Sequence, residues 1–145
     1  MNTETMNRKD FLKRMGFSAG AILATYCFGG LTTSCQSDNI GPSGIDFTLD
    51  LTQTDYSALQ NVGGYVKVNN VVIAQVATDD YVAVTQICSH EGEKQVYYRA
   101  NKNDFYCSAH GAEFDLNGKG LNNNGKRGIK VYTTELNGNE LRVFG

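Results

Sequence analysis

Apolar and polar residues alternate along short segments from Ile45 to the end of the chain, and this pattern predicts β-strands. The segment 45–51 reads Ile-Asp-Phe-Thr-Leu-Asp-Leu, which places every second side chain on one apolar face, as in a half-buried strand. Later apolar runs are separated by turn residues such as Asn, Gly and Asp. They predict strands over 65–68, 71–76, 81–85, 95–99, 104–106, 129–133 and 140–144. Because only a short turn is expected at 54–59, the fold class is all-β.

Two tight hairpin turns join these strands. Asn69-Asn70 links the second and third expected strands, and asparagine tolerates the positive φ angles of a two-residue hairpin. Asn137-Gly138 links the last two strands in the same way. A third hairpin, 95–106, lies between two cysteine–histidine motifs. We expect it to present both motifs side by side at one tip.

The N-terminal segment has the pattern of a targeting signal. Its basic residues are Arg8, Lys9, Lys13 and Arg14. They precede an apolar stretch, 15–31, that is rich in Gly, Ala and Ser and leads through small residues to Cys35. This order resembles bacterial lipoprotein signals. The resemblance implies cleavage before Cys35 and acylation of its thiol.

The expected organisation therefore has three parts. Residues 1–34 form a targeting segment, 35–44 a lipidated cysteine with a polar linker, and 45–145 the globular domain. The basic region also resembles a twin-arginine export signal, a route that carries folded cargo, with Arg8-Lys9 in place of two arginines. An uncleaved membrane helix over 15–34 is the alternative. Both interpretations predict a domain anchored in the bacterial cell envelope and held outside the cytoplasm.

The charge of the chain is unevenly distributed. The net charge is −2 over 145 residues. Residues 1–34 carry a net charge of +2, whereas residues 35–145 carry nine basic and thirteen acidic residues. Nucleic-acid binding depends on basic surfaces that neutralise phosphates. The acidic globular part therefore argues against a nucleic-acid partner.

Candidate chemistry is concentrated in two short motifs. The first is Cys-x-His, with Cys88 and His90, and the second is Cys-x-x-His, sixteen residues later, with Cys107 and His110. They contain both histidines of the chain and two of its four cysteines. Such ligands suit one tetrahedral Zn²⁺ or a [2Fe–2S] cluster with two cysteines on one iron and two histidines on the other. The ligand types alone leave both occupants open.

The surroundings of the motifs resemble the two cluster-binding segments of the Rieske iron–sulfur family. The shared pattern is Cys-x-His-x-Gly at 88–92 and Cys-x-x-His-Gly at 107–111, with Phe114-Asp115 shortly after. The resemblance covers roughly residues 45–145. It implies the all-β Rieske fold, an antiparallel β-sandwich with a small cluster-binding subdomain like that of rubredoxin or a zinc ribbon.

The resemblance also implies a ligand set. Cys88 and Cys107 are expected to bind one iron of a [2Fe–2S] cluster, and His90 and His110 the other. The implied function is one-electron transfer through the histidine-ligated iron. No nucleophile–base pair and no second metal set is evident in the sequence, so no catalytic residue of its own is predicted.

The sequence departs from the high-potential members of this family. Those proteins carry a further cysteine in each motif, and the two form a disulfide at positions where this chain has Glu93 and Ala109. They also carry a serine and a tyrosine that donate hydrogen bonds to cluster sulfurs, where this chain has Ala112 and Phe114. Finally, the segment 122–128 replaces a proline-containing cover loop. These differences predict a disulfide-free centre of low potential.

These observations predict an envelope-anchored electron-transfer component of a larger oxidoreductase or respiratory chain. Its expected partners are a redox protein or a quinol, and its membrane contact is the N-terminal lipid or helix. One alternative function is the iron–sulfur subunit of a quinol-oxidising cytochrome complex. A second alternative, from a different class, is an envelope binding module that carries zinc and has no redox function.

Overall fold

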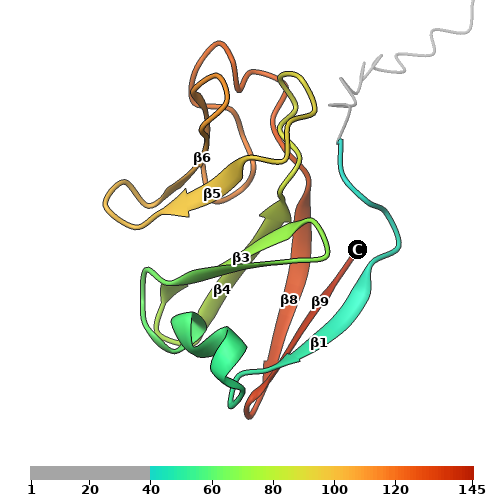
Figure 1. The fold of residues 1–145 in the computed structure, drawn as a ribbon, viewed down its shortest axis with the longest axis vertical. Coiled ribbons are helices and arrows are strands. Elements are labelled where there is room, and N and C mark those ends of the chain that lie inside the picture. The colour runs from blue at the N-terminus through green and yellow to red at the C-terminus, as the bar shows by residue number, and fades with distance from the viewer. Residues whose placement is uncertain (1–39) are drawn as a thin grey trace, which may run out of the picture. The chain divides into compact units, whose positions relative to one another are not determined.

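The computed structural model describes residues 40–145, which form nine β-strands and one short 3₁₀ helix (Figure 1). The strands form two antiparallel sheets, one of six strands and one of three. In chain order the elements are β1 (Asp46–Asp50), η1 (Thr54–Gln60), β2 (Tyr65–Val68), β3 (Val71–Ala77), β4 (Asp80–Thr85), β5 (Val96–Arg99), β6 (Asp104–Cys107), β7 (Ala112–Phe114), β8 (Val131–Asn137) and β9 (Glu140–Phe144). The predicted all-β fold is confirmed.

The larger sheet has the strand order β1-β9-β8-β4-β3-β2. One face of every strand contributes to a single apolar core, which Leu59 of η1 completes. We call it the base core; its buried members are Leu49, Leu51, Leu59, Val71, Ile73, Tyr81, Ala83, Tyr132, Leu141 and Val143. Burial of this apolar surface is the main stabilising contribution to the larger sheet.

The smaller sheet has the order β5-β6-β7, with β6 in the middle. Its inner face packs on the outer face of β3 and β4 and forms a second core. We call it the tip core; its buried members are Val72, Ala74, Val84, Cys88, Val96, Tyr98, Phe105, Cys107, Ala112, Phe114 and Ile129. The tip core differs from the base core in containing two cysteine thiols.

Strand β3 is shared between the two cores. Val71 and Ile73 point into the base core, whereas Val72 and Ala74 point into the tip core. Successive side chains of a strand alternate between the two faces of a sheet. A strand covered on both faces therefore reads as a continuous apolar run instead of an alternating one, which explains the sequence Val-Val-Ile-Ala at 71–74.

Most predicted elements are present, with differences at their ends. The expected turn at 54–59 is the helix η1, and the hairpin residues Asn69 and Asn70 have φ angles of 51° and 63°. The expected strand 129–133 begins later and extends to Asn137 as β8. Strand β7 was not predicted, because three residues are too few to show an alternating pattern.

The described part of the chain begins against the larger sheet. The carbonyl oxygen of Pro42 accepts hydrogen bonds from Lys130 Nζ at 3.0 Å and from the Tyr132 hydroxyl at 2.9 Å. Gly41 lies against Thr85 and Tyr132, where a Cβ atom would approach the Tyr132 hydroxyl to 2.9 Å. The start of the domain is thereby fixed beside β4 and β8.

The targeting segment, the apolar stretch 15–31 and Cys35 lie outside the described residues. Within residues 40–145, no helix is long and apolar enough to cross a membrane.

Candidate metal centre

The two cysteine–histidine motifs fold into similar turns, which we call the first ligand loop (88–92) and the second ligand loop (107–111). In the first, the Gly92 N–H donates to the Cys88 carbonyl at 2.8 Å, and in the second, the Gly111 N–H donates to the Cys107 carbonyl at 2.9 Å. The two glycines have φ angles of 79° and 74°, a region that glycine adopts without steric cost. Each loop thus turns within five residues and ends on a glycine.

The cysteines and histidines face different environments. Cys88 and Cys107 are 1% and 0% exposed, because both side chains belong to the tip core. Cys107 is the last residue of β6, and Cys88 follows the end of β4 by three residues. The side chains of His90 and His110 are 30% and 42% exposed, and their rings lie 5.1 Å apart, centroid to centroid. A centre held by these four residues has its thiolates in the interior and its imidazole edges at the surface.

The unpaired groups in the loops fit a metal centre. Both cysteines are free thiols, and burial raises the pKa of Cys88 to about 11, with a further increase from the adjacent Cys107. His90 Nδ1 is buried without a hydrogen-bond partner among the described residues, and buried polar atoms in native structures normally have one. Metal binding displaces thiol protons and uses imidazole nitrogens, so iron would satisfy these groups.

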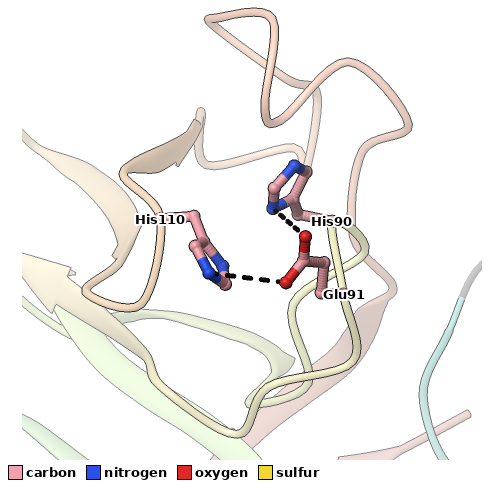
Figure 2. Close-up of side chains that lie close together, drawn as sticks. All are labelled: His90, Glu91 and His110. Atoms are coloured by element: carbon pink, nitrogen blue, oxygen red, sulfur yellow. Dashed lines mark ion pairs between the residues drawn. The ribbon is translucent and has the colours of Figure 1, made fainter.

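The Glu91 carboxylate lies beside both imidazoles, and one of its oxygens faces each ring (Figure 2). Its carboxylate oxygens are 4.0 Å from His90 Nδ1 and 3.4 Å from His110 Nε2. Potential ligand atoms of these three residues lie within 4.8 Å of one another. The Glu91 side chain is 57% exposed, and two histidines with one carboxylate are also ligands of mononuclear iron. Such a site would leave the two buried cysteines unused.

A third loop, residues 121–128, holds both ligand loops, and we call it the clasp loop. Asn124 Nδ2 donates to the His110 carbonyl and Asn122 Nδ2 to the Gly111 carbonyl, each at 2.7 Å. Arg127 Nη2 donates to the His90 carbonyl at 2.5 Å. The clasp loop stands where the sequence lacked the family's proline-containing cover, and it joins the two ligand loops without a disulfide.

The outer face of the smaller sheet carries an ion-pair network. Arg99 on β5 donates to both carboxylate oxygens of Asp104 on β6, at 2.8 and 2.5 Å. It also bonds Glu113 on β7 at 2.8 Å, and Lys102 bonds the same oxygen at 3.3 Å. Hydrogen bonds from Arg99 and Lys102 hold the pKa of Glu113 below its usual value. The network links the three strands that support the second ligand loop.

The structure brings the four sequence-predicted ligands to one end of the domain, as two neighbouring cysteines and two neighbouring histidines. Asp115 closes a turn, because its Oδ1 accepts from the backbone N–H of Asn117 and of Lys119. Asn122, Asn124 and Arg127 were not predicted as supporting residues. The sequence shows three consecutive asparagines at 122–124. It gives no sign of their partners, because the carbonyl groups that Asn122, Asn124 and Arg127 bind lie 11 to 37 residues away.

Comparison with known proteins defines the class. The sequence model of the Rieske [2Fe-2S] domain matches residues 47–133, more than half of the chain. The chain therefore belongs to the Rieske [2Fe–2S] domain family. It carries a [2Fe–2S] cluster and transfers electrons, which excludes the zinc alternative.

Several solved structures are similar to this chain. The plasma membrane Rieske protein PetC3 of Synechocystis PCC 6803 is 27% identical over 57% of this chain and 85% of its own, with a TM-score of 0.48. The ferredoxin of carbazole 1,9a-dioxygenase from Nocardioides aromaticivorans IC177 is 18% identical over 71% of this chain and 98% of its own, with a TM-score of 0.52. A naphthalene 1,2-dioxygenase bound to phenanthrene is 21% identical over 70% of this chain and 26% of its own, with a TM-score of 0.52. The latter two support the fold. No curated protein matches closely enough to count as a relative.

Proposed function

We propose that Cys88 and Cys107 bind one iron of the cluster and that His90 and His110 bind the other. The observation that carries this assignment is the difference in burial between the two pairs. Thiolates held in the tip core are shielded from solvent, while the imidazole edges reach the surface, where an electron can pass to or from a partner. The bound cluster supplies one-electron chemistry, and the protein supplies ligands, burial and a defined surface around it.

The protein thus acts as an electron-transfer component of a larger oxidoreductase or respiratory chain. In this proposal, any substrate chemistry takes place on the partner. The test is iron and acid-labile sulfide analysis of the purified full chain, combined with electron paramagnetic resonance of the reduced protein. Two irons and two sulfides per chain with a Rieske spectrum are expected. One zinc per chain and no spectrum would contradict the assignment.

The protein is proposed to be anchored in the bacterial cell envelope through lipid on Cys35, with the domain outside the cytoplasm. The support is the order of basic, apolar and small residues before Cys35. Stable anchoring requires two acyl chains or an equivalent second signal. Labelling cells with a radioactive fatty acid should label the wild-type chain and not Cys35→Ser. A Cys35→Ser chain that remains membrane-bound with residues 1–34 attached would support the uncleaved helix instead.

A further inference from the structure

Basic side chains surround a hollow beside the clasp loop. The hollow measures about 480 Å³ and is lined by residues 117–120, residues 126–129 and Val131. All three of its charged lining residues, Lys119, Lys126 and Arg127, are cationic and exposed. Val131 adds an exposed apolar side chain. The hollow thus combines a small apolar contact with three positive charges.

These positive charges are not neutralised within the described part of the chain. None of the three cations forms an ion pair with a carboxylate there. Asp115 is the nearest acid in sequence, and its Oδ1 already accepts the backbone N–H groups of Asn117 and Lys119, each at 2.9 Å. An incoming anionic group therefore meets cations that have no carboxylate partner of their own.

The hollow lies next to the first ligand loop, which contains His90. Arg127 lines the hollow and also donates to the His90 carbonyl. His90 carries one of the two exposed imidazole edges. A partner that binds the hollow is consequently placed against the first ligand loop, where a short distance between redox centres is needed.

The rest of the domain has the opposite charge. Apart from the three cations of the hollow, residues 35–145 carry six basic and thirteen acidic residues. Two of the acidic residues, Glu91 and Glu93, are exposed at the first ligand loop. An acidic partner is repelled by most of this surface and attracted at the hollow. Local charge of this kind orients encounter complexes and raises association rates more than it raises affinity.

We propose that the hollow lined by Lys119, Lys126 and Arg127 is a docking surface for an acidic face of the redox partner protein. The proposal rests on the electron-transfer function proposed above and specifies the chemistry of the partner. One electron passes from the reduced cluster to the partner's oxidised centre, or in the reverse direction, and no bond is formed or broken in that step.

The test uses cytochrome c as a probe of either charge. The reduced full chain is mixed by stopped flow with native, basic cytochrome c or with the succinylated, acidic form, and the reduction of ferric to ferrous haem is recorded. We expect the acidic form to react faster at low ionic strength. Lys119→Glu and Lys126→Glu should each slow it about three- to tenfold, and salt should abolish the difference because it screens these charges.

Lys67→Glu provides the matched control. Lys67 is exposed on β2 and does not line the hollow, so this change alters net charge equally and should leave the rate near the wild-type value. The visible spectrum of each variant first establishes that the cluster is present. Its absence would count against the proposed function and not against the docking surface.

Three outcomes would overturn the docking surface. Faster reaction with basic cytochrome c would show that the negative charges of Glu91 and Glu93, and not the hollow, determine which partner associates at the first ligand loop. If Lys67→Glu slowed the reaction as much as Lys119→Glu and Lys126→Glu, the lower rates would reflect the net charge of the protein and not the hollow. Unchanged rates, combined with release of Lys126→Glu from phosphatidylglycerol vesicles that retain the wild-type chain, would make the hollow a lipid contact.

Discussion

The base core and the tip core are stabilised in different ways. In the base core, every buried member is aliphatic or aromatic, and the strands around it pair in antiparallel ladders. The tip core includes two cysteine thiols, those of Cys88 and Cys107. The loops above it are held by side chains of the clasp loop that bind backbone carbonyls.

This difference separates the stability of the fold from the stability of the site. The base core is stabilised by removal of apolar surface from water, which requires no cofactor. Apart from Cys88, Ser89 and Cys107, the residues of the ligand loops are exposed or half-buried. We therefore expect the order of these loops to depend on the cluster and on a few polar contacts. Perturbations should therefore affect one region much more than the other.

The largest expected effect is loss of the cluster on removal of one ligand. His90→Ala, and likewise alanine at Cys88, Cys107 or His110, should abolish the Rieske absorption and paramagnetic resonance, because cluster binding and loop folding are linked. Two-dimensional NMR should still show dispersed signals from the base core. Ser108→Ala, at an exposed position of the second ligand loop, is the control. A full Rieske spectrum from His90→Ala would disprove the ligand assignment.

The converse perturbation is a cavity in the base core. Leu141 is 0% exposed, and Leu141→Ala should lower the free energy of unfolding by about 2–5 kcal/mol. Denaturant titration would measure it, while the resonance spectrum of the folded protein should not change. Leu136→Ala on β8 is the matched control and should have a smaller effect, since Leu136 pairs with Leu141 in the sheet and is 36% exposed. A spectral change in Leu141→Ala would show that the two regions are coupled.

A smaller effect is expected from the clasp loop. Asn124→Ala removes the hydrogen bond to the His110 carbonyl, which is worth about 1 kcal/mol. Cluster loss at elevated temperature, followed by visible absorbance, should accelerate about fivefold, with little change in the unfolding of the base core. Asn123→Ala alters the neighbouring exposed residue and should have no effect. Equal rates of cluster loss in the two variants would show that the Asn124 hydrogen bond does not help to retain the cluster.

The smallest effect concerns the reduction potential. Rieske centres span about −150 to +300 mV, and Ala112 and Phe114 donate no side-chain hydrogen bond, so we expect a midpoint of about −150 to 0 mV. Ala112→Ser with Phe114→Tyr should raise it by about 40 mV for each hydrogen bond formed. Voltammetry of the full chain measures the shift, with Ala100→Ser as the control. A wild-type midpoint above about +200 mV would contradict the argument.

The sequence predicted the base core better than the tip. Period-two alternation and turn residues located most strands of the larger sheet, because local pattern determines which face of a strand is buried. The residue types and spacing predicted four candidate ligands, which stay a prediction; the structure brings them together as two neighbouring cysteines and two neighbouring histidines. Strand β7, the position of Glu91 beside both imidazoles and the contacts of Asn122, Asn124 and Arg127 were missed. Strand β7 is too short to show an alternating pattern. The other features join loop residues that are distant in the chain, and such contacts leave no local periodicity.

The hydrogen bonds to the Pro42 carbonyl determine where the N-terminal chain enters the domain. Lys130, which makes one of them, directly precedes β8 and follows Arg127 of the clasp loop by three residues. The entry point therefore lies at the end of β8 that is next to the clasp loop, and not at the end next to the turn at Gly138. A chain from Cys35 to Pro42 reaches about 25 Å when fully extended. With lipid on Cys35 as proposed, a short tether would join the membrane to the domain near the ligand loops. On that proposal, the redox partner would have to come within reach of a domain tethered to the membrane surface.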